Sequence, residues 1–276
     1  MRTDFDKHSL NTSRCHARID LVATDLDGTL IGAADTPDGL ISFGQRLREL
    51  RASHNTRWVI ITGRQLAAAN DVLDQFASLG LFPDFLVTED ARVHDYGKAG
   101  IPMPHRRWNG ALTFRRTMAR LRSRRQLQEC GRALLTRFPD AQDKARNGID
   151  VWFHFADEAS AQDAEMLLSN GMSPPDSFFV LRWGQELCLA PKTGTKGEAL
   201  NYLCRRLGIH SSGVFVIGDG PNDRSMLQRE VAGMTACVGN ATDEILDTVR
   251  TIGGYVARGN GMAGVLEALR VYSGTS

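Results

Sequence analysis

The sequence lacks long apolar runs, a charge imbalance and paired cysteines, and each absence excludes a class of protein. No apolar run reaches the roughly 18 residues that a transmembrane helix needs, so we expect no membrane partner. Lys and Arg total 33 and Asp and Glu 32, a balance that gives no reason to expect nucleic acid as a partner. The five cysteines are odd in number and widely spaced without metal-ligand pairing, which favours a reducing cytoplasm.

Length and composition indicate a globular protein with one large domain or two ordinary ones. The chain has 276 residues, of which 42% are hydrophobic, enough to build a substantial core. The segment 1–17 is polar and mixed in charge, and it lacks the apolar centre of a signal peptide. We therefore expect residues 1–17 to form a disordered tail.

Short apolar runs alternate with helical patterns in the first third and in the last third of the chain. Residues 19–23, 57–61 and 85–87 are typical of buried strands, and 39–52 and 65–79 have helical spacing. The same alternation resumes after Pro191. It predicts an α/β fold with a doubly wound parallel sheet, a Rossmann-like core made of residues 18–88 and 191–276.

The segment 89–190 interrupts this rhythm. Prolines break up its beginning, an arginine-rich helix is expected over 114–138, and strands are expected over 149–155, 177–181 and 186–189. We interpret 89–190 as an inserted α+β domain. A solvated basic face explains the arginines best, although such a face also raises the local concentration of anionic substrates.

Carboxylates gather where the predicted strands end. Asp25 and Asp27 directly follow the first strand, and Asp219 and Asp223 follow the strand 213–217. In parallel sheets these ends share one edge, where ligands bind. Four carboxylates there need a cation, and oxygen ligands without His or Cys suit Mg²⁺. Taken alone, the pair Asp25 and Asp27 is also compatible with a turn and a helix cap.

The order of these residues resembles that of the haloacid dehalogenase-like (HAD) phosphatase superfamily. The large insert between the second and third motifs is similar to the large α/β cap class of this superfamily. Within that class, Lys196-Gly197-Glu198-Ala199-Leu200 and Val238-Gly239-Asn240-Ala241 resemble the sucrose-phosphatase-like branch. Cys188 departs from many relatives, which carry an acidic residue there. The four motifs correspond to Asp25-Leu26-Asp27-Gly28-Thr29, to Thr62, to Lys196, and to Gly218-Asp219 with Asn222-Asp223.

The resemblance implies a phosphatase that forms an aspartyl-phosphate. Asp25 is the implied nucleophile and Asp27 the implied acid and base. Thr62 and Lys196 would complete the catalytic set by holding the phosphoryl oxygens. Gly63 would line the substrate site beside Thr62.

The resemblance also implies the metal shell. Asp25, Asp219 and the backbone carbonyl of Asp27 would bind Mg²⁺, with Asp223 completing the shell directly or through water. Asn222 would lie nearby, on the substrate side.

Structural alternatives remain open for several of these residues. Thr62 and Asp223 are also typical helix-capping residues. Lys196 is compatible with a solvated first helical turn, although a cation there opposes the helix dipole. Arg64 is interpreted as a surface residue or an outer neighbour of the site.

Polar residues of the insert are candidates for reading a sugar. Hydrogen-bonding groups and an aromatic face suit a polyhydroxylated ligand, yet each is also compatible with an idle exposed position. The candidates are Gln142, Lys144, Arg146, Asn147, Arg182, Trp183, Gln185 and Glu186.

The sequence therefore predicts a Mg²⁺-dependent sugar-phosphate phosphatase. Two alternatives stay open: a phosphomannomutase-like phosphotransferase with the same core chemistry, and a non-catalytic sugar-phosphate-binding protein. A binding protein has no need of Asp27. The sequence does not indicate an oligomeric state.

Overall fold

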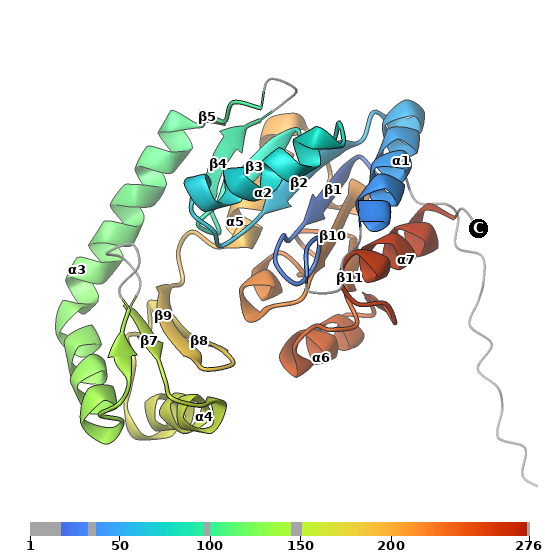
Figure 1. Ribbon diagram of the computed structural model, residues 1–276. Helices are drawn as coiled ribbons and strands as arrows, with labels where there is room; N and C mark the ends of the chain where they lie inside the picture. Colours follow the sequence, from blue (N-terminus) through green and yellow to red (C-terminus); the bar gives the residue numbers. More distant parts are fainter. Residues whose placement is uncertain (1–17, 33–36, 97–99, 145–150, 275–276) are drawn as a thin grey trace, which may run out of the picture.

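The computed structural model describes residues 18–32, 37–96, 100–144 and 151–274, arranged around two separate sheets (Figure 1). The predicted tail 1–17 lies outside these ranges. Among the described residues, no helix is both long and apolar enough to cross a lipid bilayer.

The larger sheet has eight strands in the order β12-β11-β10-β1-β2-β3-β4-β5. The six from β12 to β3 are parallel, and β4 and β5 add an antiparallel edge. Its central strands are mostly apolar and almost entirely buried, as is typical of strands covered on both faces. The strands are β1 Leu21–Thr24, β2 Arg57–Ile61, β3 Phe85–Thr88, β4 Arg92–Asp95, β5 Met103–Pro104, β10 Val214–Gly218, β11 Met234–Cys237 and β12 Tyr255–Val256.

Helices cover this sheet, which confirms the predicted doubly wound α/β fold (Figure 1). Their apolar sides join the strands in one large core, with Trp58 stacked against Phe76 and edge-on to Phe43. The helices are α1 Pro37–His54, α2 Leu66–Ser78, α5 Lys196–Leu207, α6 Asp243–Thr251 and α7 Gly261–Ser273, with the short 3₁₀ helices η2 Ser211–Gly213 and η3 Pro221–Ser225.

The smaller sheet is antiparallel, in the order β6-β7-β9-β8. Helix α4 packs against one face and shares a second apolar core with it. The elements are β6 Gln142–Asp143, β7 Val151–His154, α4 Glu158–Met166 followed by the short π-helix η1 Leu167–Gly171, β8 Phe178–Trp183 and β9 Glu186–Pro191.

Helix α3, Arg106–Arg137, links the two sheets and is longer than the predicted 114–138 (Figure 1). Leu112 packs into the larger core, whereas Leu127 and Leu134 pack into the smaller one. The strands β4 and β5 fall within the expected insert 89–190, yet they pair with the larger sheet. The single helix α3 therefore packs against both sheets and connects them.

Candidate active site

Three adjacent strands bring the predicted site residues to one edge of the larger sheet. β1 lies between β10 and β2, with Thr24 opposite both Ile217 and Ile60. The next residue, Asp25, donates its backbone N–H to the carbonyl of Ile217 at 3.0 Å. Because the strands are parallel, the segments that follow β1, β2 and β10 leave the sheet side by side.

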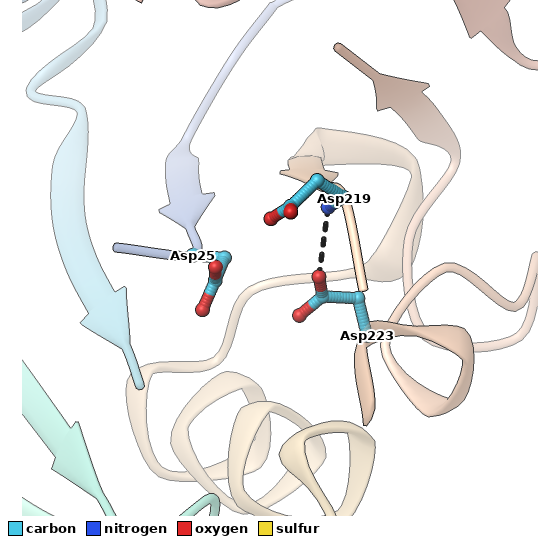
Figure 2. A group of neighbouring side chains, drawn as sticks. All are labelled: Asp25, Asp219 and Asp223. Carbon is cyan, nitrogen blue, oxygen red and sulfur yellow. Dashed lines mark hydrogen bonds between the residues drawn. The ribbon is translucent and has the colours of Figure 1, made fainter. Parts of the chain in front are cut away.

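Three carboxylates meet at this edge (Figure 2). One oxygen from each of Asp25, Asp219 and Asp223 lies within 4.8 Å of the other two. Asp223 is fully buried on η3, where one carboxylate oxygen accepts the backbone N–H groups of Asp219 (2.8 Å) and Gly220 (2.9 Å). Thr29 donates its hydroxyl to Asp219 at 2.8 Å. Converging carboxylate oxygens of this kind, held in place by hydrogen bonds, are ligands for a hard divalent cation.

Lys196 is buried between two of these carboxylates. Its Nζ lies 2.5 Å from Asp25 Oδ1 and 2.6 Å from Asp223 Oδ1, and the side chain is only 1% exposed. Thr195 caps α5 by accepting the N–H of Glu198, which places Lys196 as the first helical residue. The pairing supplies the reason for a cation at a helix N-terminus, where the dipole disfavours it.

The pKa values at this edge reflect burial and excess negative charge. Burial raises the pKa of Asp25 well above its ordinary value, and Lys196 opposes this shift. Burial, followed by the charge of Asp223, raises the pKa of Asp219 to about 6. Burial would lower the pKa of Lys196, but Asp223, Asp25 and Asp90 raise it. Three carboxylates and one ammonium leave a net negative charge that a divalent cation would offset.

The carboxylate of Asp27 lies apart from this triad and faces Arg64. Arg64 donates to Asp27 through Nη2 (2.5 Å to Oδ1) and Nε (2.9 Å to Oδ2). The Asp27 side chain is 51% exposed, unlike the buried Asp25. Arg64 thus forms an ion pair with the site residue Asp27, whereas its sequence context favours an exposed residue outside the site.

Gly28 allows the chain to turn directly after Asp27. Its φ of +74° lies in the left-handed region, and a Cβ there would stand 2.3 Å from Asp219 Oδ2. Asn240 donates its side-chain amide to the Gly28 carbonyl at 2.9 Å. The loop therefore needs glycine for both conformation and space.

Thr62 directly follows β2 and is fully buried. Its hydroxyl accepts the N–H of Arg64 at 3.1 Å, while Gln65 occupies the N-cap position of α2. The alternative interpretation of Thr62 as the cap of α2 is therefore wrong. Thr62 instead shapes the turn that presents Gly63 and Arg64.

A cavity of about 1240 Å³ separates this edge from the smaller sheet. Asp25, Asp27, Gly63, Lys196 and Asn222 line it on the side of the larger sheet. The opposite wall comes from the smaller sheet, through Trp152, Phe179, Leu181, Arg182, Trp183 and Glu186. The fold thus brings most of the predicted core residues together around one space.

The register of the smaller sheet shows which candidates of the insert reach this space. Trp183 pairs with Glu186 across β8 and β9, and Trp152 stacks on Trp183 with ring centroids 5.5 Å apart. Gln142 and Lys144 are exposed and are not among the residues lining the cavity, nor is Gln185. Arg146 and Asn147 lie outside the described residues.

Several residues at the cavity have no local sequence signal. Trp152 belongs to an apolar run and Asp90 to a turn, so only the tertiary structure reveals that both line the cavity. Arg116 belongs to the run interpreted as a solvated face, yet it is 5% exposed. It donates to the carbonyls of Glu89 and Gly194 at the junction of the two sheets.

A family model and one relative match this chain over almost its whole length, and a second relative matches part of it. The sequence model of the family described as sucrose-6F-phosphate phosphohydrolase matches residues 19–273. A Streptococcus pyogenes protein named as a phosphatase is 27% identical over 91% of this chain and 97% of its own. The mannosylfructose-phosphate phosphatase of Agrobacterium fabrum is 32% identical over 38% of this chain and 42% of its own.

Solved structures show the same fold. The sucrose-phosphatase of a Synechocystis species, solved with sucrose and phosphate, has a TM-score of 0.64 at 21% identity. The match covers 93% of this chain and 98% of that protein. A Streptococcus mutans protein matches with a TM-score of 0.61 at 16% identity, over 93% of this chain and 100% of its own.

Proposed function

The chain belongs to the sucrose-6F-phosphate phosphohydrolase family of HAD phosphatases, and from this premise we propose that it is a Mg²⁺-dependent sugar-phosphate phosphatase acting through an aspartyl-phosphate. The observation that carries the proposal is the buried ion pair of Lys196 with Asp25, two residues that both line the cavity. An anionic ester can approach an anionic nucleophile only where cations offset both charges.

In the proposed reaction Asp25 attacks phosphorus through a carboxylate oxygen. The bond from Asp25 to phosphorus forms while the ester P–O bond breaks, and Asp27 gives a proton to the leaving oxygen. Water then attacks the phosphoryl group, Asp27 takes its proton, and Asp25 is released with inorganic phosphate. Arg64 holds the Asp27 carboxylate on the cavity side, where the leaving group would lie.

We propose the acidic triad as the Mg²⁺ site. Asp25, Asp219 and Asp223 would hold the ion together with the backbone carbonyl of Asp27. The bound cation would supply charge neutralisation at the phosphoryl group. The convergence of two buried carboxylates and one half-buried carboxylate supports this assignment.

Phosphoryl oxygens would be held by Lys196, the Thr62–Gly63 turn and the amide of Asn222. Lys196 provides the charge, and the turn provides polar groups at the end of β2. Gly63 and Asn222 are close neighbours, because a Cβ on Gly63 would lie 3.8 Å from Asn222 Nδ2.

The smaller sheet would bind the sugar. Trp152 and Trp183 offer aromatic faces and Glu186 a carboxylate for hydroxyl groups, on the wall opposite Asp25. The cavity is large enough for a disaccharide phosphate, and one relative is named for such a substrate. We place the beginning of this substrate domain within α3, between Leu112 and Leu127, rather than at residue 89.

We propose a cytoplasmic location. Four cysteines that the structure describes are buried, free thiols, and such thiols suit a reducing compartment. They are Cys130, Cys188, Cys204 and Cys237.

Phosphate release from a panel of sugar phosphates, with and without Mg²⁺, tests the function. The panel contains sucrose 6-phosphate, mannosylfructose phosphate and simple hexose phosphates. Asp25→Asn should abolish release, whereas Asp247→Asn, which alters an exposed ion pair, should keep it. Full activity of Asp25→Asn would exclude the mechanism. Isomerised sugar phosphate in place of free phosphate would indicate a phosphomutase.

A further inference from the structure

The turn between β3 and β4 has an unusual backbone. Glu89 and Asp90 have φ values of +49° and +63°, and the N–H of Ala91 returns to the carbonyl of Thr88 at 3.1 Å. A β-turn in which both central residues have positive φ is normally built from Asn-Gly or Gly-Gly. Residues other than glycine are disfavoured at positive φ, so the presence of Glu89 and Asp90 in this turn needs an explanation.

Asp90 contacts the site through Asn222. Its Oδ1 accepts the side-chain Nδ2–H of Asn222 at 2.9 Å, across 132 positions of sequence. Its backbone N–H donates to the carbonyl of Thr62 at 3.0 Å, and both Asp90 and Asn222 line the cavity. A Cβ on Gly63 would lie 3.6 Å from Asp90 Oδ1, so the carboxylate sits beside the turn after β2.

A carboxylate at this point fixes which way the Asn222 amide faces. An ionised carboxylate only accepts hydrogen bonds, so it selects the NH₂ end of the amide. The amide oxygen then faces Gly220, where a Cβ would lie 3.0 Å from it. One hydrogen of the NH₂ group is used on Asp90, and the second can be donated into the cavity.

We propose that Asp90 is a positioning residue for phosphate binding, because it holds the Asn222 amide with its NH₂ group toward the phosphoryl oxygens. The inference rests on the proposed phosphate-binding role of Asn222. In the opposite orientation the amide oxygen would face the phosphate and repel it. The Asn222 NH₂ group thus donates to the phosphate, and the more distant Asp90 carboxylate keeps this group in place.

Asp90→Asn tests the inference with almost no change of shape. An asparagine can donate as well as accept, so it no longer selects one orientation of Asn222. The Kd for inorganic phosphate with Mg²⁺, measured by titration calorimetry, should rise about tenfold, the lower end expected for a hydrogen bond to a charged group. Asn222→Ala should weaken phosphate to a similar extent, and the double variant should be no weaker than Asn222→Ala.

A glycine variant separates this role from a structural one. Asp90→Gly suits the positive φ, so it should raise the midpoint of thermal unfolding while weakening phosphate binding. Asn55→Gly is the matched control, because Asn55 has a φ of +54° between α1 and β2 and does not line the cavity. It should raise the midpoint with an unchanged Kd for phosphate.

Wild-type phosphate affinity in Asp90→Asn, or additive losses in the double variant, would overturn the inference. Wild-type protein that does not bind phosphate would overturn it as well. If the wild type binds phosphate but hydrolyses no ester, the proposed function fails and the Kd values still decide the role of Asp90. If it hydrolyses sugar phosphates, Asn222→Ala weakens phosphate binding and Asp90→Asn binds phosphate like the wild type, only the inference about Asp90 fails.

Discussion

Replacing Lys196 by Met should destabilise the protein by an amount that only a buried ion pair explains. The side chain is 1% exposed, and its Nζ lies within 2.6 Å of both Asp25 and Asp223. Removing one partner of a buried pair leaves uncompensated charge, which costs about 3–5 kcal/mol. Here two buried carboxylates lose their cation, so we expect the upper part of that range. Against a total stability of about 5–15 kcal/mol, this is a large loss.

Urea unfolding followed by circular dichroism, without Mg²⁺, measures the loss. Arg250→Met is the control, since the pair of Arg250 with Asp247 is exposed and should contribute at most about 1 kcal/mol. Mg²⁺ should stabilise Lys196→Met more than the wild type, because a cation in the acidic triad replaces the lost charge. A loss below about 1 kcal/mol, or equal effects of Mg²⁺ on both proteins, would refute this reasoning.

Three further predictions concern the loop after β1, the buried His94 and the cavity wall formed by the smaller sheet. Gly28→Ala should reduce phosphate release at least tenfold, because its Cβ would collide with Asp219 in a loop that needs φ of +74°; wild-type kcat would contradict this. Burial lowers the pKa of His94 in the folded protein below the ordinary 6.5. The contribution of neutral His94 to the free energy of unfolding is therefore complete above pH 6.5, and it is lost as the pH falls through the pKa of the folded protein. His94→Gln should therefore show a shallower fall of unfolding free energy below pH 6.5 in urea titrations, and an unchanged slope would count against it. Trp183→Ala should raise KM for the preferred sugar phosphate about tenfold while KM for p-nitrophenyl phosphate stays the same; equal changes for both substrates would exclude a sugar-stacking role.

Local patterns in the sequence were sufficient for the parallel sheet and for the strand-end motifs. Buried strands that alternate with helices can form few topologies, and the C-terminal ends of parallel strands meet at one edge. The sequence therefore predicts that Asp25, Asp219 and Asp223 lie together, and in the structure one oxygen from each lies within 4.8 Å of the other two. Most predicted strands and helices are present, but β4 and β5 were not predicted. The long helix α3 begins eight residues earlier than expected because its first turns dock on the larger sheet.

Contacts between distant segments were decided only by the tertiary structure. Asp90 and Asn222 are 132 residues apart, and nothing in either segment indicates that one orients the other. Trp152 resembles any core residue until the register of β7 and β9 places it on the cavity face. Sequence patterns report which face of an element is apolar, whereas strand order and register determine what that face meets. For this protein the sequence determined the chemistry available at the sheet edge, and the tertiary structure decided which side chains surround it.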